Sequence, residues 1–139
     1  MSLKVGKDEI FFVLPESRYS VSTRIDGYMD EDFSLCIKAK VIKELLTDKE
    51  VFLFSRNGKH AGISSFLDSL GNTVIVFTYW FTTLDEKEEK VKQVFHTLKE
   101  HEQNEFNELV MICDNFEERK ISCFINGEKS GEIQIGRAH

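Results

Sequence analysis

Hydrophobic and polar residues alternate along much of the chain, and a period of two is the pattern of β-strands. The clearest case is 33–41, where every second residue would face a core: Phe33, Leu35, Ile37, Ala39 and Val41. Two other segments, 108–113 and Thr73–Thr82, are apolar on both faces, which is typical of central strands that are covered on both sides. These segments predict a sheet-based fold.

The segment 106–135 predicts a three-stranded meander. Residues 121–125 alternate, and the Asn126-Gly127 dipeptide follows them. This dipeptide favours a type I′ hairpin turn, because both of its residues tolerate positive φ. A polar stretch at 114–119 separates this hairpin from the strand at 108–113.

Shorter segments predict the remaining strands, at 10–14, 19–25, 51–56 and 60–66. Residues 91–98 fit helical or strand spacing, and a strand is favoured because the surrounding segments are sheet. Residues 41–50 fit either one helical turn or a polar loop. About nine short strands with little helix predict an all-β fold, a two-sheet antiparallel β-sandwich that forms one domain over 1–139.

Composition and charge narrow the classes of partner. A chain of 139 residues, 41% of them hydrophobic, is long enough to fill one core. The net charge of −6 argues against a nucleic-acid partner, which requires a basic face. No apolar run reaches the roughly 18 residues of a membrane helix, and the N-terminal residues lack a signal peptide's apolar segment, so a cytoplasmic location is favoured. The ends, MSL and GRAH, indicate a module taken from a larger protein.

Cysteines and carboxylates give no metal pattern. Cys36, Cys113 and Cys123 are widely spaced and form no CxxC motif. A disulfide between Cys113 and Cys123 on neighbouring strands is one reading, and reduced core cysteines are favoured over it. An acidic stretch contains Asp26, Asp30 and Asp32 without the spacing of a calcium loop. We therefore expect no metal and no cofactor.

Three segments in order resemble the concanavalin A-like lectin/glucanase superfamily and, within it, the laminin G-like modules. They are DFSLCIKAK at 32–40, VFLFSRNG at 51–58, and ELVMICD at 108–114 followed by ISCFING at 121–127. The chain departs from the family pattern where the family has tryptophan, at Lys38 or Ala39 and at Phe106. The resemblance implies a jelly-roll sandwich and a carbohydrate-binding type of function.

Members of that superfamily that cleave glycans carry carboxylates at alternate strand positions, which places them on one face. No such triplet exists here, because Glu86, Glu88 and Glu89 lie in a lysine-rich run typical of a solvated loop. The chain also lacks GxSxG, Walker and HExxH motifs. Its four histidines are scattered and fit surface or turn positions. We expect no catalytic residues in the isolated domain.

Aromatic residues at Tyr79-Trp80-Phe81 are the strongest binding signal. A flat ring on an open sheet face can stack on the apolar face of a sugar. Alternation places Tyr79 and Trp80 on opposite faces, so only one of them can be this platform. Core positions for both rings are favoured over a platform. If only Trp80 is in the core, Tyr79 is the remaining candidate platform on this strand. Arg56, Asn57 and His60, in a turn beside that sheet, are the candidate hydrogen-bonding residues, although a plain solvated turn is favoured over a binding role.

These observations predict a non-catalytic, carbohydrate-binding-like module of a larger protein, with a glycan or a protein as its partner. The parent protein would be a carbohydrate-active enzyme. One alternative is a protein-interaction module on the same fold. Another is an accessory domain of an enzyme such as a glycosyltransferase, with no ligand of its own.

Overall fold

The computed structural model describes residues 2–5, 10–13, 33–55, 61–82, 89–113 and 120–134. Strands dominate these parts of the chain, and the only helices in them are two single 3₁₀ turns, η1 (Lys43–Leu45) and η2 (Glu100–Glu102). The strands are β1 (Ser2–Val5), β2 (Ile10–Val13), β3 (Phe33–Lys40), β4 (Val51–Ser55), β5 (Ala61–Leu67), β6 (Thr73–Thr82), β7 (Glu89–Thr97), β8 (Phe106–Cys113), β9 (Lys120–Ile125) and β10 (Glu128–Gln134).

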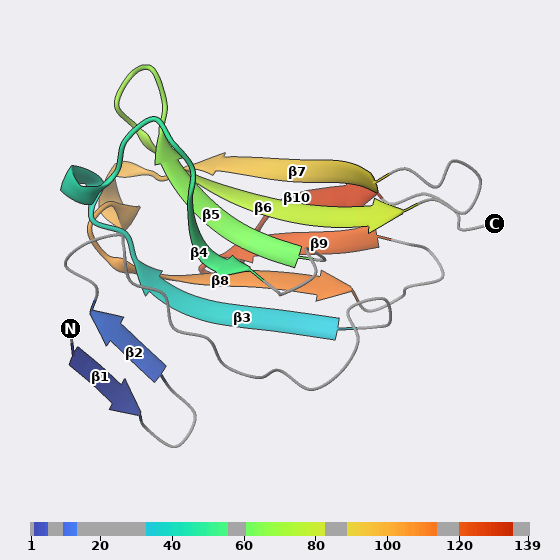
Figure 1. Cartoon of the computed structure of the whole chain (residues 1–139), viewed down its shortest axis with the longest axis horizontal. Coiled ribbons are helices and arrows are strands. Elements are labelled where there is room, and N and C mark those ends of the chain that lie inside the picture. The colour runs from blue at the N-terminus through green and yellow to red at the C-terminus, as the bar shows by residue number, and fades with distance from the viewer. Residues whose placement is uncertain are drawn as a thin grey trace.

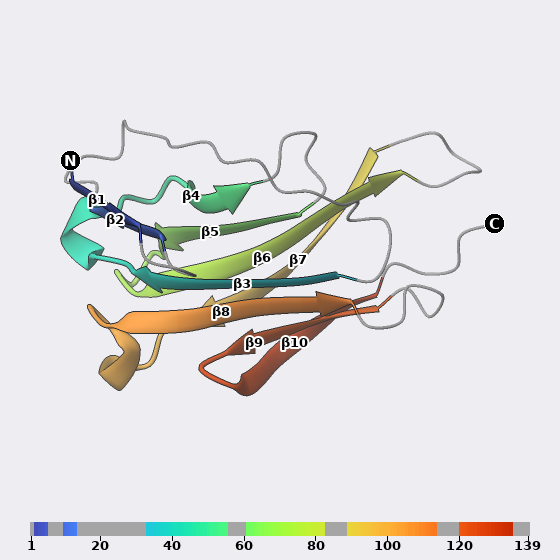
Figure 2. The ribbon, with the colours of Figure 1, turned by 90° about the horizontal axis from the view of Figure 1, so that it is seen from below.

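Eight of these strands form two four-stranded antiparallel sheets. Sheet I has the order β10-β9-β8-β3 and sheet II the order β4-β5-β6-β7, while β1 and β2 pair separately. Figure 2 shows the two layers from the side, with β4, β5 and β6 in one and β8, β9 and β10 in the other. Figure 1 shows the sandwich turned by 90° from this view. The prediction of an all-β, two-sheet antiparallel sandwich is confirmed.

The core lies between the two sheets, as strand alternation requires. Sheet I contributes every second residue of β8 and β9, and sheet II does the same from β5 and β6. The largest fully buried side chains of this layer are Phe77, Ile63, Ile75, Leu109, Met111 and Ile121. Burying these side chains is the main favourable contribution to folding, at roughly 1.5–3 kcal/mol each.

Both strands that the sequence predicts as central are central. β8 lies between β9 and β3, and β6 lies between β5 and β7. On β6, Ile75 and Phe77 face the core, while Val76 and Thr78 are buried at 1% exposure on the opposite face. An apolar run without alternation therefore did indicate a central strand, most of whose side chains are buried on both faces.

The alternation predicted at 33–41 is also confirmed for 34–41, and the side chain of Phe33 lies outside the described part of the structure. Leu35 and Val41 are buried, and Ile37 and Ala39 pack against the core. The residues between them are exposed: Ser34, Cys36, Lys38 and Lys40. Of the ambiguous segment 91–98, residues 91–97 belong to strand β7, and 43–45 forms a single helical turn.

The Asn126-Gly127 turn has the predicted backbone. Asn126 has φ 52° and Gly127 has φ 83°, both in the left-handed region that a type I′ turn needs. Ile125 pairs with Glu128 across this two-residue loop. The strand predicted at 19–25 and the turn predicted at 114–119 lie outside the described residues.

One side of the sandwich is joined where β7 of sheet II meets β10 of sheet I. A Cβ on Gly131 would lie 2.8 Å from Val94 Cγ1, so only glycine allows this approach. Lys92 Nζ donates a hydrogen bond to the Gln134 carbonyl oxygen at 2.5 Å. The β9–β10 register shifts between Lys129 and Gly131, which leaves Ser130 as the extra residue of a β-bulge.

All three cysteines are described, and none of them is in a disulfide bond. Cys36 is exposed, while Cys113 and Cys123 are buried. The preference for reduced core cysteines over a Cys113–Cys123 disulfide is confirmed. In the part of the chain that the structure describes, neither helix has the length or apolar character needed to cross a membrane.

Candidate functional site

The outer face of sheet II carries a pair of aromatic rings. Phe52 of β4 and Trp80 of β6 have ring centroids 6.1 Å apart, with planes inclined by 38°. Gly62 of β5 lies beneath them, and a Cβ there would lie 3.1 Å from Trp80 Cζ3 and 3.2 Å from Phe52 Cε1. The absence of a side chain at Gly62 therefore lets both rings lie against the strand between them.

We call this surface the aromatic face; its residues are Phe52, Gly62, Ser64, Val76, Thr78, Trp80, Val91, Gln93 and Phe95. Strand register places Phe52, Ser64, Val76 and Phe95 in one row across the four strands. Phe52 is 46% exposed and Phe95 is 58% exposed, whereas Ser64 and Val76 between them are buried. A ligand on this face would therefore contact the exposed rings of the two edge strands more readily than the buried Ser64 and Val76 between them.

Polar groups stand beside the rings. The Ser64 hydroxyl donates a hydrogen bond to the Glu50 carboxylate, and Glu50 itself is exposed. Gln93 Nε2 donates a hydrogen bond to Thr78 Oγ1 at 3.3 Å. Gln93 is exposed on β7, two residues from Val91, which pairs with Trp80. The aromatic face thus combines apolar ring surface with carboxylate and amide groups that can bind hydroxyls.

The structure reverses the expected positions of the two adjacent aromatic residues. Tyr79 pairs with Ala61, points between the sheets and is only 3% exposed, with its ring stacked on Phe81 at 6.2 Å. Trp80 is half-buried on the aromatic face. The preference for Trp80 as the core residue is therefore wrong. Alternation gave the opposition of the two rings, but not which face was the inner one.

Of the other predicted ligand contacts, Arg56, Asn57 and His60 lie outside the described residues. Ligand binding by any of the five residues stays a prediction. No sequence pattern marks Phe52, Gly62, Gln93 or Phe95 as binding residues. Their isolated positions carry no motif, and only the pairing of four strands brings them together.

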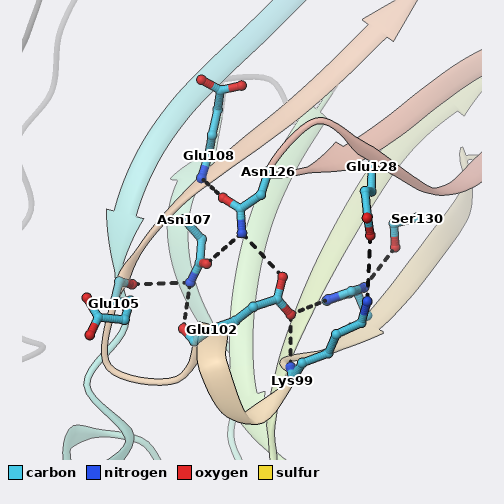
Figure 3. A network of polar contacts seen from close by, with 9 residues as sticks. Lys99, Glu102, Glu105, Asn107, Glu108, Asn126, Glu128 and Ser130 are labelled. Carbon is cyan, nitrogen blue, oxygen red and sulfur yellow. Dashed lines mark hydrogen bonds and ion pairs between the residues drawn. The ribbon is translucent and has the colours of Figure 1, made fainter.

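A second set of polar residues gathers at one end of the sandwich, around the buried carboxylate of Glu102 in η2 (Figure 3). Glu102 Oε1 accepts hydrogen bonds from the Lys99 backbone N–H at 2.9 Å and from His96 Nε2 at 3.2 Å. Its Oε2 accepts one from Asn126 Nδ2 at 3.2 Å. Each carboxylate oxygen is thereby satisfied, as burial requires.

The asparagines Asn107 and Asn126 extend this polar network to sheet I (Figure 3). Asn126 Nδ2 donates to Asn107 Oδ1, and Asn126 Oδ1 accepts from the Glu108 backbone N–H, both at 2.9 Å. Asn107 is buried and donates to the Glu102 carbonyl oxygen at 2.9 Å. Asn126, predicted as a turn residue only, is therefore also a bridge between the hairpin and η2.

Two opposing effects act on the pKa of the Glu102 carboxyl. Burial raises it, but hydrogen bonds from Lys99, His96 and Asn126, together with attraction to His96, outweigh burial and hold the pKa below its ordinary value. Glu102 is thus ionised at neutral pH. Burial alone raises the pKa of the Cys123 thiol to about 12, which makes it unreactive.

Among the described residues, no three His, Cys, Asp or Glu side chains are grouped so that they could hold a metal ion. Asp26, Asp30 and Asp32 lie outside those residues. No family model, curated protein or solved structure matches the chain.

Proposed function

We propose that this chain is a carbohydrate-binding-like module that holds a glycan on the aromatic face and is non-catalytic toward that glycan. The observation that supports this most is the contact between Trp80 and Phe52, whose rings lie together on the outer face of a sheet. Side chains on the outer face of a sheet do not fill the core between the two sheets, so these rings are not explained by core packing. Aromatic rings in such a place offer a flat apolar surface for the C–H side of a sugar.

The polar surroundings support a hydroxyl-rich ligand over a purely apolar one. The Glu50 carboxylate and the Gln93 amide are exposed on opposite sides of the aromatic face. Phe52 and Phe95 stand on the two edge strands, three inter-strand spacings or roughly 14 Å apart. This width suits a chain of several sugars better than a single ring.

The resemblance to the concanavalin A-like superfamily and its jelly-roll topology belongs to this proposal. The segments that carry the resemblance fall on β3, on β4, and on the β8–β9 pair, and so come from both sheets of the sandwich. Within a larger carbohydrate-active protein, such a module would hold that protein on its glycan. The competing function is an accessory or protein-interaction domain, for which the same face would contact a protein.

A glycan array with purified protein tests this proposal. We expect binding to oligosaccharides, and loss of that binding in Trp80→Ala. Phe106→Ala is the matched control, because Phe106 is an exposed aromatic at 58% exposure on sheet I, away from the aromatic face. Binding that Trp80→Ala retains, or an array on which the folded protein binds nothing, would reject the proposal and favour the protein-interaction alternative.

A further inference from the structure

The polar network contains a serine, a histidine and a carboxylate in series. Ser130 Oγ lies 3.3 Å from His96 Nδ1, and His96 Nε2 lies 3.2 Å from Glu102 Oε1. The three residues come from β10, β7 and η2, so the series crosses the joint between the two sheets. No part of the aromatic face belongs to it.

The direction of these hydrogen bonds follows from the charge of Glu102. An ionised carboxylate can only accept, so the proton between Glu102 and His96 must be carried by His96 Nε2. In a neutral imidazole this leaves Nδ1 without a proton, as an acceptor for the Ser130 hydroxyl. Serine donor, imidazole acceptor and carboxylate orienter are the roles of an activated nucleophile, its base and the group that fixes the base's tautomer.

The three residues differ in exposure, and Glu102 is the most buried of them. The Glu102 side chain is 6% exposed, His96 is 18% exposed, and Ser130 is half-buried. The carboxylate is thus shielded from water, while Ser130 keeps part of its surface exposed. Lys99 and Asn126 hold Glu102 in place through further hydrogen bonds (Figure 3).

The β-bulge places Ser130 in this series. An extra residue in one strand re-aims a side chain, and bulges occur often beside active sites. Ser130 is that extra residue, and the glycine after it lets β10 approach β7 closely enough for the Ser130–His96 contact. In a regular strand, Ser130 would be paired with a residue of β9 and its side chain would be aimed differently.

We propose that Ser130 is the nucleophile of a second site, which takes the acyl group of small carboxylic esters. Ser130 Oγ forms a bond to the acyl carbon while its proton passes to His96 Nδ1. The leaving alkoxide then takes that proton and departs as an alcohol. Water attacks the acyl-serine with His96 as its base, which releases the acid and returns the proton to Ser130. Glu102 acts through His96 and is a positioning residue. This proposal is independent of glycan binding.

Labelling with a fluorophosphonate tests this site, because the probe bonds to an activated serine and releases fluoride. The labelled residue is identified by peptide mass mapping of the whole chain. We expect the label on Ser130 and its loss in Ser130→Ala. His96→Gln should slow labelling roughly 100-fold, the usual contribution of a general base. Ser34→Ala is the control, since Ser34 is exposed on β3 and far from the series in the fold.

Urea-unfolded wild-type protein supplies a comparison that does not depend on the folding of any variant. Its Ser130 has lost His96 and must label no faster than free serine. Faster labelling of Ser130 in the native than in the unfolded chain supports the proposal. Equal labelling of the two, label only on other residues, or undiminished labelling of a folded His96→Gln variant would overturn it.

Discussion

Tyr79 and Trp80 are neighbours in sequence but lie on opposite faces of β6. Tyr79 is 3% exposed in the layer between the sheets, and Trp80 contacts Phe52 on the aromatic face. One residue therefore belongs to the folding core, and the next is available to a ligand. This division is the structural basis of the proposed function, and it makes different predictions for the two side chains.

Tyr79→Ala should cost more stability than Trp80→Ala. The first removes a ring packed on all sides, for which we expect a loss of about 3–5 kcal/mol in the free energy of unfolding. The second removes a half-buried ring on the outer face, for which we expect roughly 1–2 kcal/mol. Urea denaturation followed by far-UV circular dichroism measures both. Equal losses, or a larger loss for Trp80→Ala, would contradict the assignment of the two faces.

Glu102 should make the fold sensitive to acid. Its pKa is lower in the folded chain than in the unfolded one, so its contribution is complete above the unfolded value of about 4.3. That contribution is lost as the pH falls through the folded pKa, where the carboxylate accepts a proton. We expect Glu102→Gln to lower stability at pH 7 by about 1–3 kcal/mol and to flatten its decline below pH ~4.3.

Urea denaturation at a series of pH values measures this effect. Glu100→Gln, in the same 3₁₀ turn but exposed, is the matched control and should behave as wild type. A Glu102→Gln variant with the acid profile of wild type would show that the buried carboxylate contributes nothing through its charge.

Asn126 should combine a backbone role with a side-chain role. Asn126→Gly keeps the residue's positive φ but removes the hydrogen bonds to Glu108, Asn107 and Glu102. Asn126→Ala removes the same bonds and adds left-handed strain of roughly 1–2 kcal/mol. Thermal denaturation should therefore rank wild type above Asn126→Gly and Asn126→Ala lowest. If alanine is tolerated as well as glycine, the turn does not have the backbone described.

Thiol reactivity should distinguish the three cysteines. Cys36 is exposed, whereas Cys113 and Cys123 are buried and the pKa of Cys123 is raised to about 12. Only one thiol should react with Ellman's reagent in the native protein, and three in denaturant. Cys36→Ser should abolish the native reaction. A second fast thiol in the native protein would contradict the burial of β8 and β9.

Much of the fold could be predicted because strand patterns are local. Alternation at 33–41, the doubly apolar β6 and the Asn126-Gly127 turn each depend on neighbouring residues only. What alternation could not supply is which face of a doubly apolar strand is the inner one. On β6 both faces are buried along most of the strand, so the sequence offered no basis for preferring Tyr79 or Trp80 as the core residue.

The candidate sites were harder to predict, because they depend on pairing between distant segments. The row from Phe52 to Phe95 requires three strand pairings in the correct register, including a bulge between Phe52 and Phe54. Ser130, His96 and Glu102 are brought together by a β-bulge and a 3₁₀ turn. A histidine in an alternating strand looks like a surface residue until its partners are known.

The most direct test of the central claim is iodide quenching of tryptophan fluorescence, because Trp80 is the single tryptophan. In the free protein we expect partial quenching, between that of a free indole and that of a buried one. An oligosaccharide that binds on the array should protect Trp80 from iodide. Phe52→Ala should weaken the binding of this oligosaccharide by about 1–3 kcal/mol, the range for stacking of bases on aromatic rings. A bound glycan that leaves the quenching of Trp80 unchanged would contradict the claim that the aromatic face is the binding site.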